Sequence, residues 1–335
     1  MGGYEVILTG FADEGPSSKR AEEQLAICRA LGMSYYTIRF VDAGEGVKNV
    51  MKLSDQEVRR LQALHRDYEM RVSSIGSPIG KIKLVDREDG TTNAYIPFDK
   101  YLKEDVAHAI DLAHAFETKL IRGFSFYPPK GDDPWKYVDQ SADRLKQIAA
   151  KCREAGVTFG LEVEGHLIGQ NGALLKALHE QVASDQLCLI YDCGNIVYQG
   201  FSALEALDQY RQMEAGMGWI HVKGVRTPKD PAMDAHLKAR NLAGFVSVDV
   251  GDAGHEMSLR AFRESLPRLN DAWRSRGVPG VFMDLEPHIK SGGQFGGFSG
   301  PDGFGVAFRG LLKLLDFVGI TYHLTDFYDL KNQPV

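Results

Sequence analysis

Four segments with the composition of buried strands each carry a side chain that can bind a metal ion. Acidic and imidazole groups inside apolar strands are costly to bury unless they are paired or ligated. Two glutamates, one aspartate and one histidine make a hard donor set that suits Mn²⁺ or Mg²⁺ and also admits Zn²⁺, Co²⁺ or Fe²⁺. The segments and their candidate ligands are 160–164 with Glu162, 189–192 with Asp192, 218–223 with His221, and 282–286 with Glu286.

Further polar residues follow the first of these ligands. Glu164 stands two residues after Glu162, so in a strand both side chains point to the same side. His166 comes two residues later. Either residue could act as a general base, because histidine titrates near neutral pH and burial can raise the pKa of a carboxylate. Alternatively, Glu164 hydrogen-bonds a substrate hydroxyl and His166 is an ordinary loop histidine.

Three other candidates lie after predicted strands. Lys81 ends a Gly-Ser-Pro-Ile-Gly-Lys turn, where it could bind an enolate oxygen or a hydroxyl, or could be a solvated loop lysine. Lys223 points to the same side as His221, so we expect it to line the same mouth. His288 follows Glu286 by two residues and is a further candidate for substrate contact, as is Asn195.

Segment 292–305 alternates glycines with Phe295, Phe298 and Phe304. It is no Walker A loop, because Gly-Lys-Ser/Thr does not end it. The pattern favours a lid whose aromatic faces stack on a bound molecule. A structural Ω-loop packed on the rest of the chain is the alternative.

The elements that must position these residues alternate along the chain. Short apolar runs typical of buried parallel strands are separated by amphipathic, helix-like stretches, several of which end in glycine. Eight repeats, without GxGxxG after the first strand, predict a (β/α)₈ TIM barrel in one α/β domain spanning residues 1–335. Long loops at 78–100, 226–255 and 287–305 follow strands and so belong to the active-site face. The predicted strands are 6–9, 35–40, 71–76, 120–126, 158–164, 187–192, 219–223 and 281–286, and the predicted helices are 21–31, 55–68, 101–116, 134–155, 173–182, 204–215, 258–276 and 307–318.

Composition excludes several classes of protein. The 335 residues carry a net charge of −6 with no basic block, which argues against a nucleic-acid partner. The four cysteines form no CxxC pair, so we expect neither a zinc ribbon nor a disulfide framework, and cytoplasmic localisation. The first residues do not resemble a signal peptide, and no apolar run is long enough to span a membrane.

Several of these segments together resemble the xylose isomerase-like barrel superfamily, which includes sugar phosphate isomerases and epimerases. By that resemblance the four candidate ligands fall on metal-ligand positions. Two departures bear on substrate contacts: many members have an aspartate where this chain has Gly224, and a histidine where it has Asn195. The matching segments are 10–14 (Gly-Phe-Ala-Asp-Glu), 73–81, 156–162, Asp192 with Asn195, 220–223 (Ile-His-Val-Lys) and 285–288 (Leu-Glu-Pro-His).

A more particular resemblance is to the catalytic α subunits of bacterial C-glycoside deglycosidases. It rests on Glu-Val-Glu-Gly-His at 162–166 and on the Gly-Phe-rich loop after 285–288. It implies a lyase that cleaves the carbon–carbon bond between a 3-oxo-glucosyl unit and an aromatic aglycone by proton abstraction and elimination. His166 or Glu164 would be the base, Phe295 and Phe298 would hold the aglycone, and a small β subunit would complete a hetero-oligomer.

The main alternative is a divalent-metal-dependent sugar isomerase or epimerase of the ketose 3-epimerase kind. Glu162 and Glu286 would then serve as ligands and as bases on opposite faces of the substrate. An inactive metal-dependent sugar-binding or partner subunit is a third possibility, suggested by Gly224 and Asn195. An endonuclease of the related abasic-site type is disfavoured by the net charge of −6.

Overall fold

A computed structural model describes residues 3–227, 244–289, 300–325 and 329. The chain divides into two compact units, one formed by Met1–Ser73 with Val222–Val335 and the other by Ser74–His221. Our prediction of one domain over residues 1–335 stays a prediction. Within the described ranges, no helix combines the length and the apolar character that crossing a membrane requires.

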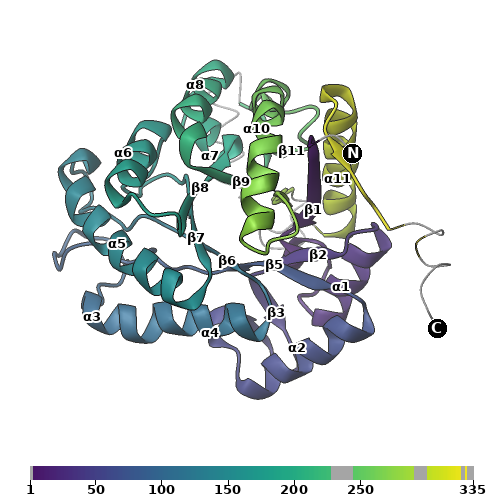
Figure 1. Ribbon diagram of the computed structural model, residues 1–335, viewed down its shortest axis with the longest axis horizontal. Coiled ribbons are helices and arrows are strands. Elements are labelled where there is room, and N and C mark those ends of the chain that lie inside the picture. Colours follow the sequence, from purple (N-terminus) through teal and green to yellow (C-terminus); the bar gives the residue numbers. More distant parts are fainter. Residues whose placement is uncertain (1–2, 228–243, 290–299, 326–328, 330–335) are drawn as a thin grey trace. The chain divides into compact units, whose positions relative to one another are not determined.

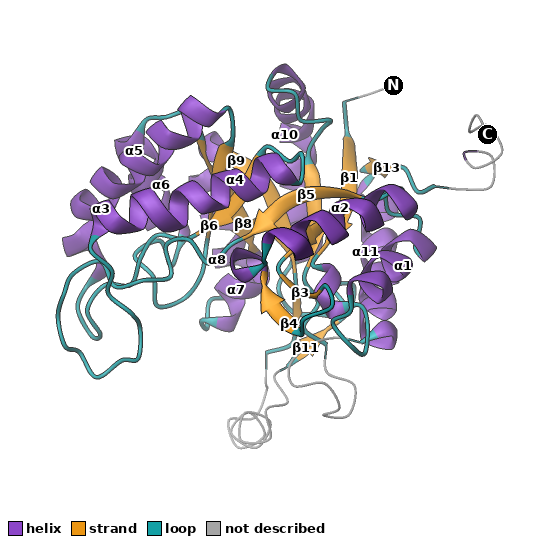
Figure 2. Ribbon diagram, turned by 90° about the horizontal axis from the view of Figure 1, so that it is seen from below, coloured by secondary structure: helices purple, strands orange, loops and turns teal. Residues whose placement is uncertain are grey.

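The second unit is built on parallel strands in the order β5-β6-β7-β8-β9. Helices α5, α6 and α8 pack on this layer, with α5 against β7 and both α6 and α8 against β8 (Figure 1). Figure 2 shows long ordered loops adjoining α3 and β6. The strands are β5 (Arg71–Gly76), β6 (Leu120–Gly123), β7 (Thr158–Glu162), β8 (Leu187–Asp192) and β9 (Met217–Val222), and the helical segments are α3 (Phe98–Tyr101), η3 (Leu102–Val106), α4 (Ala107–Ala115), η4 (Pro134–Tyr137), α5 (Val138–Ala155), α6 (Gly172–Val182), α7 (Cys193–Tyr198), α8 (Ala203–Met213) and η5 (Glu214–Gly216).

In the first unit, β1 pairs in parallel with β12 and β13. Two short antiparallel pairs, β3–β4 and β10–β11, were not predicted. The strands are β1 (Glu5–Gly10), β2 (Tyr35–Ile38), β3 (Phe40–Asp42), β4 (Val47–Asn49), β10 (Gly224–Val225), β11 (Phe245–Val246), β12 (Phe282–Leu285) and β13 (Thr321–Tyr322), and the helical segments are η1 (Ala12–Glu14), α1 (Ala21–Ala30), η2 (Val50–Lys52), α2 (Asp55–Asp67), α10 (His255–Ser275) and α11 (Pro301–Val318).

Each of the eight predicted strands corresponds to a strand of the structure, from β1 to β12. The local reason is clearest in β7, whose burial is continuous from Thr158 to Glu162. Its Gly160 leaves room for Trp219 of β9, because a Cβ at Gly160 would lie 2.1 Å from the Trp219 ring. A glycine in this strand therefore allows a large aromatic side chain to fill the interior next to the candidate ligands.

Two helix predictions need correction. The helix expected at 307–318 begins six residues earlier, because Pro301 at its first position favours a helix start. Helix α7 was not predicted, since six residues give too little periodicity to detect. It begins directly after Asp192, whose side chain caps it by accepting a hydrogen bond from the Asn195 backbone N–H.

Candidate metal centre

Three of the four predicted ligands lie together in the second unit. Glu162 ends β7, Asp192 ends β8, and His221 stands in β9 at the position paired with Asp192. Each is buried, with at most 2% of its surface exposed. One ligand atom from each lies within 4.8 Å of the others. These three residues are called the ligand trio below.

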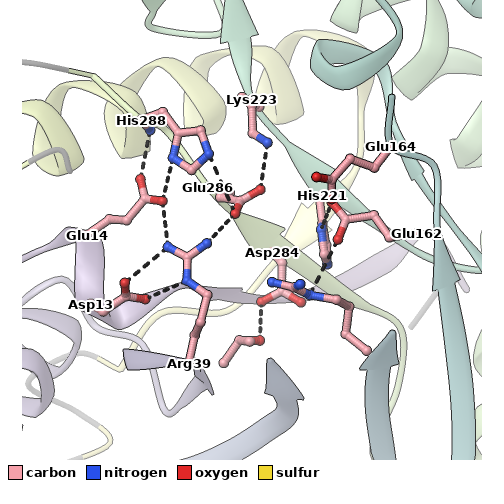
Figure 3. Close-up of polar contacts among 12 residues, drawn as sticks. Asp13, Glu14, Arg39, Glu162, Glu164, His221, Lys223, Asp284, Glu286 and His288 are labelled. Atoms are coloured by element: carbon pink, nitrogen blue, oxygen red, sulfur yellow. Dashed lines mark hydrogen bonds and ion pairs between the residues drawn. The ribbon is translucent and has the colours of Figure 1, made fainter. Parts of the chain in front are cut away.

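Neighbouring side chains hold the ligand trio in place. The Glu162 carboxylate lies 3.1 Å from His221 Nδ1 and 3.4 Å from Arg122 Nε. Trp219 Nε1, which can only donate, lies 3.3 Å from His221 Nε2. The imidazole therefore turns Nδ1 toward Glu162, as Figure 3 shows for the labelled pair.

Asn195, predicted as a substrate contact, touches two residues of the trio. Its Nδ2 donates to Glu162 Oε1 at 3.2 Å and to the Val163 carbonyl at 3.1 Å. Its backbone N–H donates to Asp192 Oδ1 at 2.9 Å. One residue thus orients two of the three ligands, a role that side chains next to metal ligands commonly play.

The donor chemistry of the ligand trio fits a divalent cation. Oxygen and nitrogen ligands stand about 2.0–2.3 Å from such ions, so two ligands of one ion lie no more than about 4.6 Å apart. The trio is close to that limit without rearrangement. Carboxylates with one imidazole accept Mn²⁺, Mg²⁺, Zn²⁺, Co²⁺ and Fe²⁺ alike, so the donor types do not select among them.

Glu286, the fourth predicted ligand, lies in the first unit directly after β12. Its Oε2 lies 2.8 Å from Lys223 Nζ, and its Oε1 accepts a hydrogen bond of 2.5 Å from Arg39 (Figure 3). Lys223 was predicted to contact substrate; it is 4% exposed, and its ammonium is bound to Glu286. Both carboxylate oxygens of Glu286 therefore face cations.

Arg39 is a functional candidate that the sequence analysis missed. Its guanidinium donates to Asp13 at 3.1 and 3.2 Å and to Glu14 at 2.8 Å, in addition to Glu286. Burial alone lowers the pKa of Arg39, but Asp13, Glu286 and Glu14 together raise it. The available signal was a charged residue at the end of an apolar strand. Arg39, Asp13, Glu14 and Glu286 are called the Arg39 network below.

His288 joins the Arg39 network through Glu14. Its Nδ1 lies 2.6 Å from Glu14 Oε1, and its backbone N–H donates to Glu14 Oε2 at 2.7 Å. Burial favours the neutral form of Glu14, but His288 and Arg39 outweigh it and lower the pKa of Glu14 to about 2. Glu14, Glu286 and His288 also have ligand atoms within 4.8 Å of one another. Arg39 already bonds both carboxylates, so a metal ion held by Glu14, Glu286 and His288 together would lie against a fixed positive charge. A carboxylate oxygen offers two lone pairs, so each oxygen of Glu286 can meet a cation of the chain and still bind an ion elsewhere.

Lys81 and Glu164 form an ion pair in the second unit. Lys81 Nζ lies 2.7 Å from Glu164 Oε1, and both side chains are about one-third exposed, at 30% and 32%. His166 is also exposed, and its backbone φ is +67°. The structure thus joins two of the three candidate catalytic residues directly and leaves His166 on the surface of the same unit.

The prediction of an aromatic lid is wrong for one of its three phenylalanines, Phe304. Phe295 and Phe298 lie outside the described residues. Phe304, expected in the same loop, stands in the first turn of α11 and is fully buried. A Cβ at Gly10 would lie 3.1 Å from its ring, so Phe304 packs in the core of the first unit. It offers no exposed aromatic face to a ligand.

Two more buried charged residues were not predicted from the sequence. Arg122 lies within β6 and contacts Glu162, as described above. Asp284 stands two residues before Glu286 in β12 and accepts a hydrogen bond of 2.6 Å from Thr37 Oγ1. Each is a charged residue inside an apolar run, which is the same signal that identified the ligands.

Comparisons with known proteins agree with this architecture. A search of the curated proteins finds no match. A xylose isomerase-like TIM barrel protein from Mycobacterium smegmatis, solved in complex with magnesium, is 18% identical with a TM-score of 0.62 over 94% of this chain and 96% of that one. A probable 3-DHS dehydratase involved in petrobactin synthesis in Bacillus anthracis is 14% identical with a TM-score of 0.60 over 92% and 98%. A D-allulose 3-epimerase from Methylomonas sp. is 13% identical with a TM-score of 0.59 over 93% and 98%.

At these identities the likeness shows the fold, and it confirms the predicted barrel. The family model described as xylose isomerase-like TIM barrel matches residues 25–248, which is more than half of the sequence. That match runs through all three residues of the ligand trio. The chain therefore belongs to the xylose isomerase-like TIM barrel family.

Proposed function

We propose that this chain is a divalent-metal-dependent enzyme that acts on a sugar or glycoside. The observation that carries the proposal is the buried ligand trio. We propose Glu286 as the fourth ligand, because in a barrel of this family the ends of the strands that carry all four residues face one mouth. Mn²⁺ is our proposed ion among those that this donor set accepts.

A divalent ion held there would stabilise negative charge on a substrate oxygen and so ease removal of a proton next to a carbonyl. The chain must then supply the base. Glu164 follows the ligand Glu162 by two residues, and His166 is exposed after it, so either can accept the proton. Lys81 fixes Glu164 through their ion pair.

The specific reaction we propose is a C-glycoside deglycosidase-type elimination. The base removes the proton at C2 of a 3-oxo-C-glucoside, the bond from C1 to the aromatic carbon breaks, and its electron pair leaves with the aglycone. The aglycone carbon then takes up a proton, so the products are a 1,2-unsaturated 3-oxo sugar and free aglycone. The resemblance of 162–166 and of the Gly-Phe-rich loop supports this reaction, with Phe295 and Phe298 holding the aglycone and a small β subunit completing the enzyme.

A ketose 3-epimerase is the second candidate, favoured by the D-allulose 3-epimerase among the similar structures. That reaction needs bases on both faces of the substrate, and Glu286 would be one of them. In this chain both oxygens of Glu286 contact cations, Arg39 and Lys223. A carboxylate held in this way suits a ligand better than a proton carrier, which supports elimination.

One comparison of substrates tests the proposal. The metal-loaded chain is given an aromatic C-glucoside in its 3-oxo form and, separately, free ketoses, each with Mn²⁺ or with chelator. We expect aglycone release with Mn²⁺ and its loss with chelator. Epimerised ketose with hydrogen exchange from solvent, and no aglycone, would establish the second candidate instead. Purification together with a small second chain would support the hetero-oligomer.

A further inference from the structure

The turn after β5 holds Lys81 in a fixed place. Gly80 has a φ of +92°, and a Cβ there would lie 2.0 Å from the Phe124 carbonyl oxygen. Phe124 N donates to the Ile79 carbonyl at 2.7 Å, and Lys81 N donates to the Pro78 carbonyl at 2.9 Å. The turn is therefore pressed against the chain after β6, and only glycine fits at its closest point.

The Lys81 ammonium has two neighbours and keeps capacity for a third. It donates to Glu164 Oε1 at 2.7 Å and lies 4.2 Å from the centre of the Phe124 ring. An ammonium has three donors, so one N–H remains for a ligand at a side chain that is 30% exposed. Glu164 Oε2 makes no hydrogen bond within the described residues, and this side chain is 32% exposed. A donor and an acceptor thus stand side by side at the surface.

A bonded lysine–glutamate pair fits a neutral hydroxyl better than an ion. A hydroxyl can accept from the ammonium and donate to the carboxylate at once. A phosphate would be attracted by Lys81 but repelled by Glu164, and an amine would meet the reverse.

The buried cation of the same unit described above is already bound to a carboxylate. Arg122 lies 3.4 Å from Glu162. A phosphate would have to break this ion pair to gain that counter-charge. An uncharged sugar has no such requirement, so the charges next to the ligand trio disfavour phosphorylated ligands.

We infer that the Lys81–Glu164 pair is a subsite that binds a hydroxyl of an uncharged glycosyl unit and discriminates against phosphorylated sugars. Glu164 follows Glu162, the last residue of β7, by two residues, which can span at most about 7 Å, on the scale of one pyranose ring. The pair therefore binds a hydroxyl on the far side of the ring from the ligand trio. This inference rests on the proposed function and specifies its substrate class.

Binding without turnover tests the subsite. The unoxidised aromatic C-glucoside lacks the 3-carbonyl, so it serves as a non-reacting ligand in calorimetric titrations of the Mn²⁺-loaded chain. We expect Lys81→Met and Glu164→Gln each to weaken binding 10- to 100-fold. The two effects should not add, so the double variant should bind about as tightly as the single variant with the lower affinity. A 6-phosphate on the ligand should weaken binding to the wild type at least tenfold. Lys146→Met is the matched control, because Lys146 pairs with Asp143 on the exposed face of α5, and it should bind as the wild type does.

Ligands that lack one hydroxyl, at C4 or at C6, locate the contact. On the wild type, one of these deoxy ligands should bind 10- to 100-fold more weakly than the parent glucoside. On Glu164→Gln, that deoxy ligand and the parent glucoside should bind equally weakly. If a single substitution prevents folding, the swap Lys81→Glu with Glu164→Lys restores a neutral pair, and the folded swap should bind the glucoside within about tenfold of the wild-type affinity. Thermal midpoint and bound Mn²⁺ verify each variant.

Three results would overturn the subsite: single variants that bind as the wild type does, tighter binding of the phosphorylated ligand, or equal binding of every deoxy ligand. Where only the swap folds, a swap that fails to bind the glucoside would overturn it as well. Glu164→Gln with unchanged affinity but no hydrogen exchange at C2 would make Glu164 the base and would also refute the subsite. Failure of the proposed function looks different: the wild type shows the expected binding pattern but never releases aglycone from the 3-oxo glucoside.

Discussion

The ligand trio and the Arg39 network use similar acidic and imidazole side chains in different ways. In the second unit, Glu162 and Asp192 are oriented by a neutral amide, Asn195, at distances of 2.9–3.2 Å. In the first unit, Glu14 and Glu286 surround the fixed guanidinium of Arg39. In the trio, Glu162 lies 3.4 Å from one cation of the chain, Arg122, whereas a single guanidinium bonds Asp13, Glu14 and Glu286 together. The first arrangement suits an ion taken from solution, and the second is already balanced around its own cation.

The largest expected effect comes from removing a ligand of the trio. Glu162→Gln keeps the shape of the side chain but removes a negative donor, so we expect loss of bound Mn²⁺ and a fall in turnover of at least about 100-fold. Metal analysis and initial rates measure this effect. Glu14→Gln, the matched change in the Arg39 network, should keep its metal. Equal loss of metal in both variants would show that the ligand trio and the Arg39 network do not differ in their need for a metal ion.

Arg39→Met should lower the stability of the fold, whereas a change in the trio should remove the metal ion. Removing the guanidinium leaves Asp13, Glu14 and Glu286 buried without their shared cation, which costs about 3–5 kcal/mol of unfolding free energy. Urea denaturation measures the loss. Arg39→Lys keeps the charge but loses the fork that reaches several carboxylates, so its cost should be smaller. A fully stable Arg39→Met would show that the network does not need its internal cation.

The sequence allowed the eight strands and the trio to be predicted, because an apolar run that ends in a ligand is a local pattern. Arg39 was missed for the opposite reason: its partners Asp13 and Glu14 lie about 25 positions away, and no local pattern links them. Asn195 was predicted as a substrate contact, which stays a prediction. Its hydrogen bond to Glu162 was not predicted, because it depends on the short helix α7. Phe304 was misplaced because the start of α11 at Pro301 was overlooked.

Acid should affect a lone buried imidazole before it affects the Arg39 network. His255 is 4% exposed, neither ring nitrogen has a hydrogen-bond partner within the described residues, and burial lowers its pKa from 6.5 to about 4. A lowered histidine pKa gives stability that is present above pH 6.5 and is lost as pH falls toward 4, on the order of 3 kcal/mol in all. Glu14, with a pKa lowered from 4.5 to about 2, loses its contribution only as pH falls from 4.5 toward 2.

Denaturation at a series of pH values separates the two contributions. His255→Leu should flatten the stability profile between pH 6.5 and 4 and leave the loss at lower pH unchanged. Glu14→Gln should leave the loss of stability between pH 6.5 and 4.5 unchanged and should flatten the profile between pH 4.5 and 2. An unchanged slope above pH 4.5 in His255→Leu would show that another group is responsible for the loss in that range.

The smallest effect tests how the trio is oriented. Asn195→Ala removes the amide that donates to Glu162 and leaves the backbone N–H that caps α7 on Asp192. Loss of an orienting partner of a ligand typically costs 10- to 100-fold in metal affinity. We expect that loss in competition titrations with a chelator, with the thermal midpoint of the metal-free chain nearly unchanged. Gln199→Ala, which removes a side chain that donates to the backbone carbonyls of Gln170 and Asn195, is the control and should retain wild-type affinity. Wild-type affinity in Asn195→Ala would mean that the strands alone fix the ligands, and the amide would then be available to a substrate, as the sequence first suggested.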